Sequence, residues 1–287
     1  MDDHASPDWA HSRHGVRRGV VLPRRRIVFI PVPKSGTSSL RWVLADLAGL
    51  DREHFRNTTP GAYAKYAIHD LKLWPEHNRW SSLRPRRRER IGHAEGWLRF
   101  SVVRDPWRRL WSAWQSKVLL QARTFPERFD DRPWWPGPPA HPDDVVESFR
   151  AFVRALADPD TRPLDAHWLP QAAILAAGPP LTHVGRTERL DETYEVLAAH
   201  AGLSVADLAV TRRNRTPLAY TAAVYDEASR AIVRDLYRSD LEQFGYPDDP
   251  GPDTGLEQWR TQHEDEVART AEIVAKRIGL KAQRVEP

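Results

Sequence analysis

Short apolar runs along the chain alternate with longer segments in which apolar positions recur every three or four residues. Residues 27–30 form a continuous apolar run that is typical of a buried strand in a parallel sheet. Pro31 and Pro33 end this strand, because proline has no N–H to donate to a strand ladder. A helix is predicted to begin at Ser38 or Ser39. The apolar face of this helix consists of Leu40, Val43, Leu44 and Leu47.

The same alternation continues through the rest of the chain. Residues 97–103 and 181–185 predict two further strands. Further helices are predicted over residues 108–120, 145–156, 190–201, 225–243 and 255–278. Strands that alternate with helices indicate an α/β fold with a mainly parallel sheet that is covered by helices on both faces.

Changes in composition along the chain predict its division into parts. Residues 1–22 are polar and rich in His and Arg, which predicts an irregular N-terminal arm. Residues 23–249 carry the strand and helix pattern of the main domain, and residues 250–287 predict a C-terminal helical extension. A proline-dense loop carries Trp134 and Trp135, which either stack on a bound ligand or pack onto the protein's own surface.

Cysteine content and charge narrow the possible chemistry. The 287-residue chain has no cysteine, which excludes disulfides, thiolate metal sites and a cysteine nucleophile. No signal-peptide core or membrane-spanning apolar run is found, so we expect a cytoplasmic protein without a membrane span. The formal net charge is +4, and the arginine run at residues 84–90 is either a solvated face or a surface that attracts a polyanion.

The connection between the first strand and the first helix has the composition of an anion-binding loop. It reads Pro33-Lys34-Ser35-Gly36-Thr37-Ser38-Ser39. A loop that enters a helix presents unpaired backbone N–H groups and the positive end of the helix dipole, both of which favour an anion. Gly36 allows the backbone to approach a ligand closely, and Lys34 adds positive charge. This is not a Walker A loop, because Lys34 precedes the loop's only glycine instead of following a second one.

A second motif follows the predicted strand at residues 97–103. Arg104 stands at the strand end, where a guanidinium can bind a phosphate, and Ser112 lies two turns into the next helix. Three more segments follow in the chain. They are Asp165–Gln171, which contains His167-Trp168-Leu169-Pro170, then His183–Leu190, which contains Val184-Gly185, and then Tyr225–Tyr246. In this order, the motifs resemble the sulfotransferases that use 3′-phosphoadenosine 5′-phosphosulfate (PAPS). The resemblance covers residues 26–247 and is greatest to the carbohydrate sulfotransferase branch, sulfotransferase family 2.

The resemblance implies a P-loop-like three-layer sandwich and makes residues 23–249 a sulfotransferase domain. It also implies transfer of a sulfuryl group from PAPS to an acceptor hydroxyl, with adenosine 3′,5′-bisphosphate as the product and no metal. The implied donor-binding residues are Lys34, Ser35, Gly36, Thr37, Ser38 and Ser39 at the 5′-phosphosulfate and Arg104 and Ser112 at the 3′-phosphate. Lys34 would also stabilise the leaving phosphate. Arg213, in a basic loop, either contacts the 3′-phosphate or adenine side or belongs to a solvated turn.

An acceptor hydroxyl also needs a general base, which is usually a histidine or a carboxylate. The resemblance implies a base between the two donor-binding motifs, and His69, within residues 67–70, is the best candidate there. His77 and His93 are alternatives in the same region. His167 is another, although its position favours a structural or acceptor-side role.

The acceptor is expected to be an alcohol, and the branch that the motifs resemble suggests a carbohydrate. The final helix either supports a homodimer or packs on the core. Two other functions stay open. A P-loop-class nucleotide kinase would need the Walker lysine that the chain lacks. A non-catalytic polyanion-binding protein would use the arginine runs, although no specific nucleic-acid motif is present.

Overall fold

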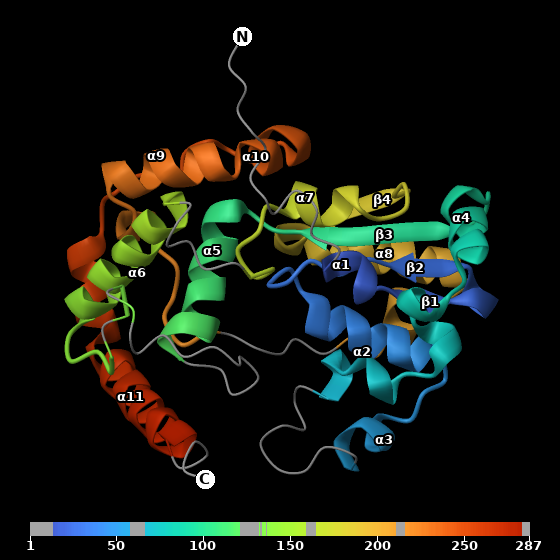
Figure 1. Ribbon diagram of the computed structural model, residues 1–287, viewed down its shortest axis with the longest axis horizontal. Helices are drawn as coiled ribbons and strands as arrows, with labels where there is room; N and C mark the ends of the chain where they lie inside the picture. Colours follow the sequence, from blue (N-terminus) through green and yellow to red (C-terminus); the bar gives the residue numbers. More distant parts are fainter. Residues whose placement is uncertain are drawn as a thin grey trace. The chain divides into compact units, whose positions relative to one another are not determined.

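The computed structural model describes residues 14–57, 67–120, 132, 134–135, 137–158, 165–210 and 216–282 (Figure 1). The chain divides into two compact units, each built from two stretches of sequence. Unit 1 contains Met1–Arg104 and Leu169–Asn214, and unit 2 contains Asp105–Trp168 and Arg215–Pro287. Each unit has a hydrophobic core of its own.

The described sheet lies in unit 1 and has four strands in the order β1-β2-β3-β4. The strands are β1 (Val20–Leu22), β2 (Ile27–Phe29), β3 (Leu98–Val103) and β4 (His183–Arg186). β2 pairs with β3 in parallel, and so does β3 with β4, whereas β1 is antiparallel to β2. The prediction of a mainly parallel sheet in an α/β fold is therefore confirmed. Because β2 and β3 are parallel, the segments that follow them leave the sheet at the same edge.

The helices of unit 1 contribute apolar side chains to the core that contains the sheet. They are α1 (His14–Arg17), α2 (Thr37–Leu47), α3 (Arg52–Asn57), α4 (Pro85–His93), α7 (Gln171–Ala176) and α8 (Leu190–Ala201). The 3-10 turns are η2 (Pro23–Arg25), η4 (Leu71–Leu73), η5 (Glu76–Asn78), η6 (Trp80–Ser82), η8 (Thr187–Arg189) and η9 (Val205–Asp207). Helix α8 packs against β3 and β4 (Figure 1). The predicted apolar face of α2 is confirmed for Leu40, Val43 and Leu44, which are fully buried.

Unit 2 is a helical unit with an aromatic core. Its elements are α5 (Pro106–Trp114), the π-helical turn η7 (Gln115–Leu119), α6 (Pro142–Ala157), η10 (Ala222–Val224), α9 (Glu227–Leu236), α10 (Arg238–Phe244) and α11 (Leu256–Ala282). The rings of Trp111 and Phe149 meet edge to face at 4.9 Å, a favoured aromatic geometry. Asp105 caps the start of α5, where Pro106 occupies a position that needs no N–H donor.

Two expectations about local structure are wrong. Residues 14–22 are not irregular, because α1 and β1 form there and β1 pairs with β2. The helix expected over residues 225–243 is two helices, since the backbone breaks at Tyr237 (φ −109°, ψ 20°). The buried Tyr237 hydroxyl donates to the Trp168 carbonyl at 2.6 Å, a long-range bond that no local pattern predicts. Helix α2 also begins at Thr37, one residue before the earlier of its two expected starts.

The structure also bears on two points that the sequence left open. Helix α11 packs against α6 within unit 2 and buries Trp259, Val267 and Val274. Trp134 is buried against the ring of Phe152 at 5.1 Å, so it packs within the protein. No helix among the described residues, including the 27-residue α11, is apolar enough over its length to cross a bilayer.

Phe100 is the central packing residue of the sheet, because it is fully buried in β3 and its ring lies 5.0 Å from that of Phe29. We expect Phe100→Ala to lower the free energy of unfolding by about 3–5 kcal/mol through the cavity it leaves. Urea unfolding measures this loss. Val184→Ala in β4 is the control, since Val184 is 41% exposed and its loss should cost less than about 1 kcal/mol. Equal losses in the two variants would contradict this assignment of the core.

Candidate functional site

The loop between β2 and α2 adopts a conformation that suits close approach of a ligand to its backbone. Gly36 caps the start of α2 with a left-handed φ of 71°, which glycine adopts without strain. Lys34 also has a left-handed φ, of 69°, which costs a residue with a side chain roughly 1–2 kcal/mol. Such strain in a non-glycine residue persists where the surrounding structure imposes it, and it is commonest at functional sites.

Hydroxyl groups of this loop make defined bonds within unit 1. The Thr37 hydroxyl donates to the Val32 carbonyl at 2.7 Å, which closes the loop onto itself. The buried Ser35 hydroxyl donates to Oε1 of Gln171 at 3.3 Å. Side chains of the loop itself therefore help to hold its conformation.

Gln171 connects the loop to the end of β3. Its Oε1 accepts from the backbone N–H of Arg104 at 2.9 Å, and its Nε2 donates to the Arg104 carbonyl at 2.7 Å. Because Oε1 also accepts from Ser35, one fully buried glutamine joins the two segments in which donor-binding residues are expected. The Arg104 guanidinium lies beside the loop as well, where Nη1 donates to the Lys34 carbonyl at 3.3 Å.

His69 lies against the first turn of α2. Its Nε2 is 2.8 Å from the Ser38 hydroxyl, and the direction of this hydrogen bond depends on the tautomer. The preceding residues, Ala67 and Ile68, are buried, so the turn that carries His69 belongs to the core. The structure therefore brings together Lys34–Ser39, Arg104 and His69 in unit 1.

The other candidate histidines have different surroundings. His77 is exposed in η5. His93 is exposed at the end of α4, where its ring lies 3.4 Å from Glu89. His167 belongs to unit 2, and its Nδ1 pairs with the carboxylate of Asp165. The His69 ring thus bonds to a side chain of the loop at residues 33–39.

Ser112 and Arg213 are the two remaining residues that the sequence predicts to bind the donor. Ser112 is buried in α5, which belongs to unit 2. Arg213 lies outside the described residues.

Two residues of the site were not singled out from the sequence. Gln171 ends a segment that was noted only for its histidine and tryptophan. Arg41 is buried in α2, where Nη1 donates to the Ile68 carbonyl at 3.2 Å and Nη2 to the Arg18 carbonyl at 2.7 Å. Both residues could have been found from the sequence, because each is a polar residue beside the apolar positions of a helical segment. The segments are Leu40-Arg41-Trp42-Val43 and Gln171-Ala172-Ala173-Ile174.

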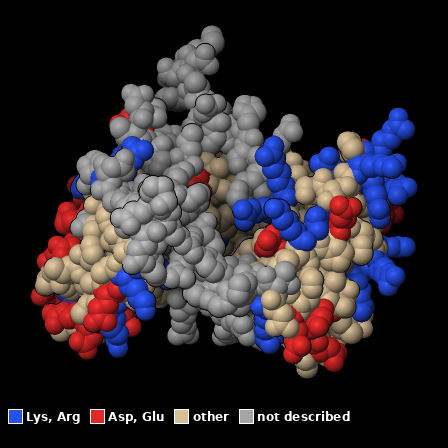
Figure 2. Space-filling view, turned by 60° about the horizontal axis from the view of Figure 1, so that its bottom comes forward, with Lys and Arg blue, Asp and Glu red and all other residues tan. Residues whose placement is uncertain are grey.

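The arginine run lies on the surface of unit 1. Exposed arginines belong to α4 and its preceding residue, and to the connection between β1 and β2; they are Arg84, Arg86, Arg87, Arg90, Arg24, Arg25 and Arg26. In Figure 2, Lys and Arg side chains gather at the right of the view, and others lie singly elsewhere on the same face. The arginine run comes before β3, and Arg26 comes directly before β2. The Lys34 loop follows β2, so the exposed arginines and the loop belong to opposite ends of the parallel strands.

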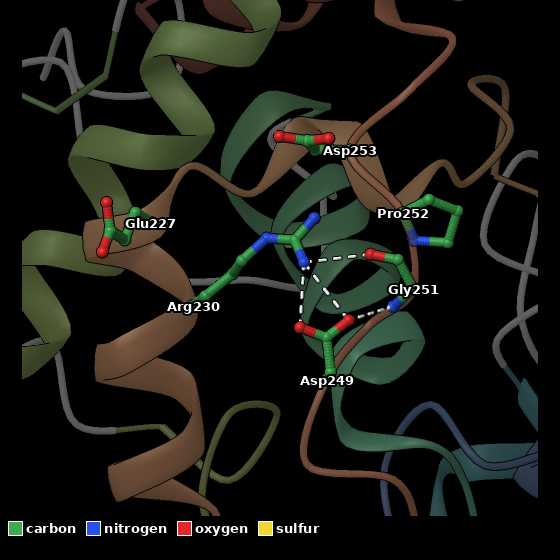
Figure 3. A pocket seen from close by; sticks show the side chains of 6 residues that line it. All are labelled: Glu227, Arg230, Asp249, Gly251, Pro252 and Asp253. Carbon is green, nitrogen blue, oxygen red and sulfur yellow. Dashed lines mark hydrogen bonds and ion pairs between the residues drawn. The ribbon is translucent and has the colours of Figure 1, made fainter.

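Unit 2 contains an open cavity of about 620 Å³, and none of the residues predicted to bind the donor or act as the base lines it (Figure 3). It is lined by Glu227, Arg230, Asp249, Gly251, Pro252 and Asp253. Nη1 of Arg230 donates to both carboxylate oxygens of Asp249, at 3.2 and 3.0 Å, and to the Gly251 carbonyl at 2.9 Å. The guanidinium and this carboxylate therefore compensate each other's charge.

Side chains that could ligate a metal are not clustered in the described part of the chain. No group of three or more His, Asp and Glu residues there has an arrangement that could hold a metal ion. Two cationic residues, Lys34 and Arg104, meet at the loop, where the Arg104 guanidinium donates to the Lys34 carbonyl.

The fold and this loop place the chain in the class of α/β proteins with a strand–loop–helix site at the carboxyl edge of a mainly parallel sheet. The chain belongs to the sulfotransferase family, whose profile matches residues 17–247. It is 25% identical over 256 residues to carbohydrate sulfotransferase 12 of Xenopus laevis, a match that covers 79% of this chain. It is 30% identical over 189 residues to carbohydrate sulfotransferase 14 of Mus musculus, which covers 61% of this chain.

These matches span only part of the two relatives, namely 60% of the frog protein and 44% of the mouse protein. No solved structure gives a significant match to the chain.

The role of Gln171 can be tested through stability and loop dynamics. Gln171→Leu removes the hydrogen-bond partner of the Ser35 hydroxyl and of the backbone N–H and carbonyl of Arg104. An unpaired buried polar group costs about 1–3 kcal/mol. We expect a fall of about 2–4 kcal/mol in unfolding free energy and faster amide hydrogen exchange over residues 34–39. Denaturant unfolding and hydrogen-exchange mass spectrometry measure the two effects.

Gln115→Leu is the matched control. Gln115 is equally buried, but it lies in unit 2, where its side chain binds the backbone N–H and carbonyl of Leu218. Its loss should destabilise the protein comparably and leave exchange over residues 34–39 unchanged. Unchanged exchange in Gln171→Leu itself would contradict the tie between loop and strand.

Proposed function

We propose that this protein transfers a sulfuryl group from PAPS to a hydroxyl of a carbohydrate acceptor, on a three-layer sulfotransferase fold. The observation that carries this proposal is the meeting of three predicted features in unit 1. The Arg104 guanidinium bonds to the Lys34 carbonyl, and the first turn of α2 bonds to His69. Membership of the sulfotransferase family supports the transfer chemistry.

The proposed donor site uses the loop and the end of β3. Backbone N–H groups at the start of α2 and the Lys34 ammonium would bind the 5′-phosphosulfate. Arg104 would bind the 3′-phosphate, because a guanidinium offers two parallel N–H donors to a phosphate. By the motif match, Ser112 would add a hydroxyl and Arg213 a second cation to the same phosphate or to the adenine.

The proposed reaction is an in-line displacement at sulfur. The acceptor oxygen forms a bond to sulfur while the bond from sulfur to the bridging phosphate oxygen breaks, and the acceptor proton passes to the unprotonated ring nitrogen of His69. Lys34 stabilises the negative charge that develops on the leaving phosphate. The Ser38 hydroxyl, 2.8 Å from Nε2 of His69, holds the ring toward the loop that binds the donor.

A carbohydrate acceptor is proposed from the relatives. The two proteins described above are both named carbohydrate sulfotransferases. A panel of p-nitrophenyl glycosides that differ in sugar and linkage can identify the preferred acceptor, with simple alcohols and phenols as the comparison.

We expect Lys34→Ala and Arg104→Ala to weaken binding of adenosine 3′,5′-bisphosphate by about 10-fold or more, since each loses a charge-assisted contact. Isothermal titration calorimetry measures this affinity, and circular dichroism checks that the variants are folded. Arg108→Ala, at an exposed arginine of α5, is the control and should bind normally. Wild-type affinity in both loop variants would rule out the proposed donor site.

We expect His69→Ala to bind adenosine 3′,5′-bisphosphate normally and to lose about 10²–10⁴-fold in kcat, the usual contribution of a general base. Release of this product from labelled PAPS measures turnover. His93→Ala, at an exposed histidine paired with Glu89, is the control and should keep wild-type kcat. Normal turnover in His69→Ala would exclude it as the base, and magnesium-dependent ATP turnover without sulfuryl transfer would favour a kinase instead.

A further inference from the structure

Arg41 is a buried cation that has no carboxylate partner among the described residues. Its side chain is only 1% exposed, and its Nε is buried without a hydrogen-bond acceptor. Burial, together with the nearby positive charge of Arg18, lowers the pKa of Arg41 to about 9, so the guanidinium still carries its charge at neutral pH. Burying an unpaired charge costs stability, and stability alone therefore does not explain this residue.

The guanidinium of Arg41 holds the backbone at the residue before His69. Its Nη1 donates to the Ile68 carbonyl at 3.2 Å, and the same carbonyl accepts from Nε1 of Trp74 at 3.1 Å. Ile68 and Trp74 are themselves buried. The carbonyl of Ile68 is thus held from two sides within the core of unit 1.

Ser38 and Arg41 act on this turn from one helix face. They are three residues apart in α2, so their side chains are neighbours on the same side of the helix. Ser38 bonds to the His69 ring, and Arg41 bonds to the backbone that precedes it. Two contacts one helical turn apart restrain both the position and the orientation of the imidazole.

Arg41 also links this turn to the start of the sheet. Its Nη2 donates to the Arg18 carbonyl at 2.7 Å, two residues before β1 begins at Val20. Since α2 also carries the anion-binding loop at its N-terminus, one side chain joins the helix, the histidine turn and the first strand segment.

We propose that Arg41 is a positioning residue that holds His69 in line with the α2 loop for sulfuryl transfer. This inference rests on the proposed function, in which His69 is the base. A base that is displaced by about 1 Å can lose on the order of 10²-fold in rate while substrate binding is retained.

The test is a double-mutant cycle between Arg41 and His69. In the wild-type background, Arg41→Gln is expected to lower kcat about 10- to 100-fold and to leave the KM for PAPS within about 3-fold. In the His69→Ala background the same change is expected to alter kcat by less than about 2-fold, because the base it positions is absent. Turnover is measured with PAPS and the best acceptor of the glycoside panel. Equal losses in the two backgrounds would overturn the proposal.

Arg99→Gln is the matched control. Arg99 is also a buried arginine of unit 1 that donates to backbone carbonyls, those of Pro180, Ile91 and Ala94, but it lies in the first half of β3. The Arg99→Gln variant should lose about as much stability as Arg41→Gln but keep the wild-type kcat. If Arg41→Gln does not fold, Arg41→Lys, which keeps the charge and one donor nitrogen, is carried through the same cycle with a smaller expected loss.

A second measurement does not depend on turnover. The imidazole resonances of His69, assigned by their loss in His69→Ala, are expected to shift in Arg41→Gln and to stay unchanged in Arg99→Gln. If the wild-type protein transfers no sulfuryl group from PAPS, the proposed function fails, while these spectra still decide whether Arg41 positions His69. Unchanged His69 resonances in Arg41→Gln would overturn the positioning role itself.

Discussion

The parallel pairing of β2 with β3 is the constraint on which the site in unit 1 depends. Parallel strands end at the same edge of a sheet, so the Lys34 loop after β2 and Arg104 after β3 emerge side by side. The buried Gln171 then bonds to both segments, which converts proximity into a defined geometry. Without this pairing, two motifs about 70 residues apart in sequence would not lie side by side.

The same region carries costs that the rest of unit 1 must offset. Lys34 has a strained left-handed backbone, and Arg41 buries a charge that has no carboxylate partner in the described part of the chain. The sheet core, in which Phe29, Phe100, Leu40, Val43 and Leu44 are fully or almost fully buried, supplies the compensating hydrophobic free energy. Costly groups concentrated at one loop and one helix are typical of a site whose geometry serves binding or catalysis.

In unit 2, aromatic packing and long-range hydrogen bonds to the backbone determine where the helices become irregular. Gln115 binds both backbone groups of Leu218 at the π-helical turn, and the Tyr237 hydroxyl binds the Trp168 carbonyl where α9 gives way to α10. Both irregularities occur where a side chain holds a segment that is distant in sequence. They are consequences of packing, which overrides the continuous helices that periodicity favours.

The sequence by itself determined the elements whose signals are local: the strands β2, β3 and β4, the helices α2 and α8, the loop at residues 33–39 and the position of Arg104 after a strand. Apolar period, proline and glycine act over a few residues and can be read along the chain. Only the tertiary structure decided that β1 joins the sheet, that Gln171 bridges two motifs and that Arg41 holds the turn of His69. The apolar run of β1 follows a polar segment, and only its pairing with β2 identifies it as a strand. A buried polar side chain likewise finds its partner only after distant segments have packed together.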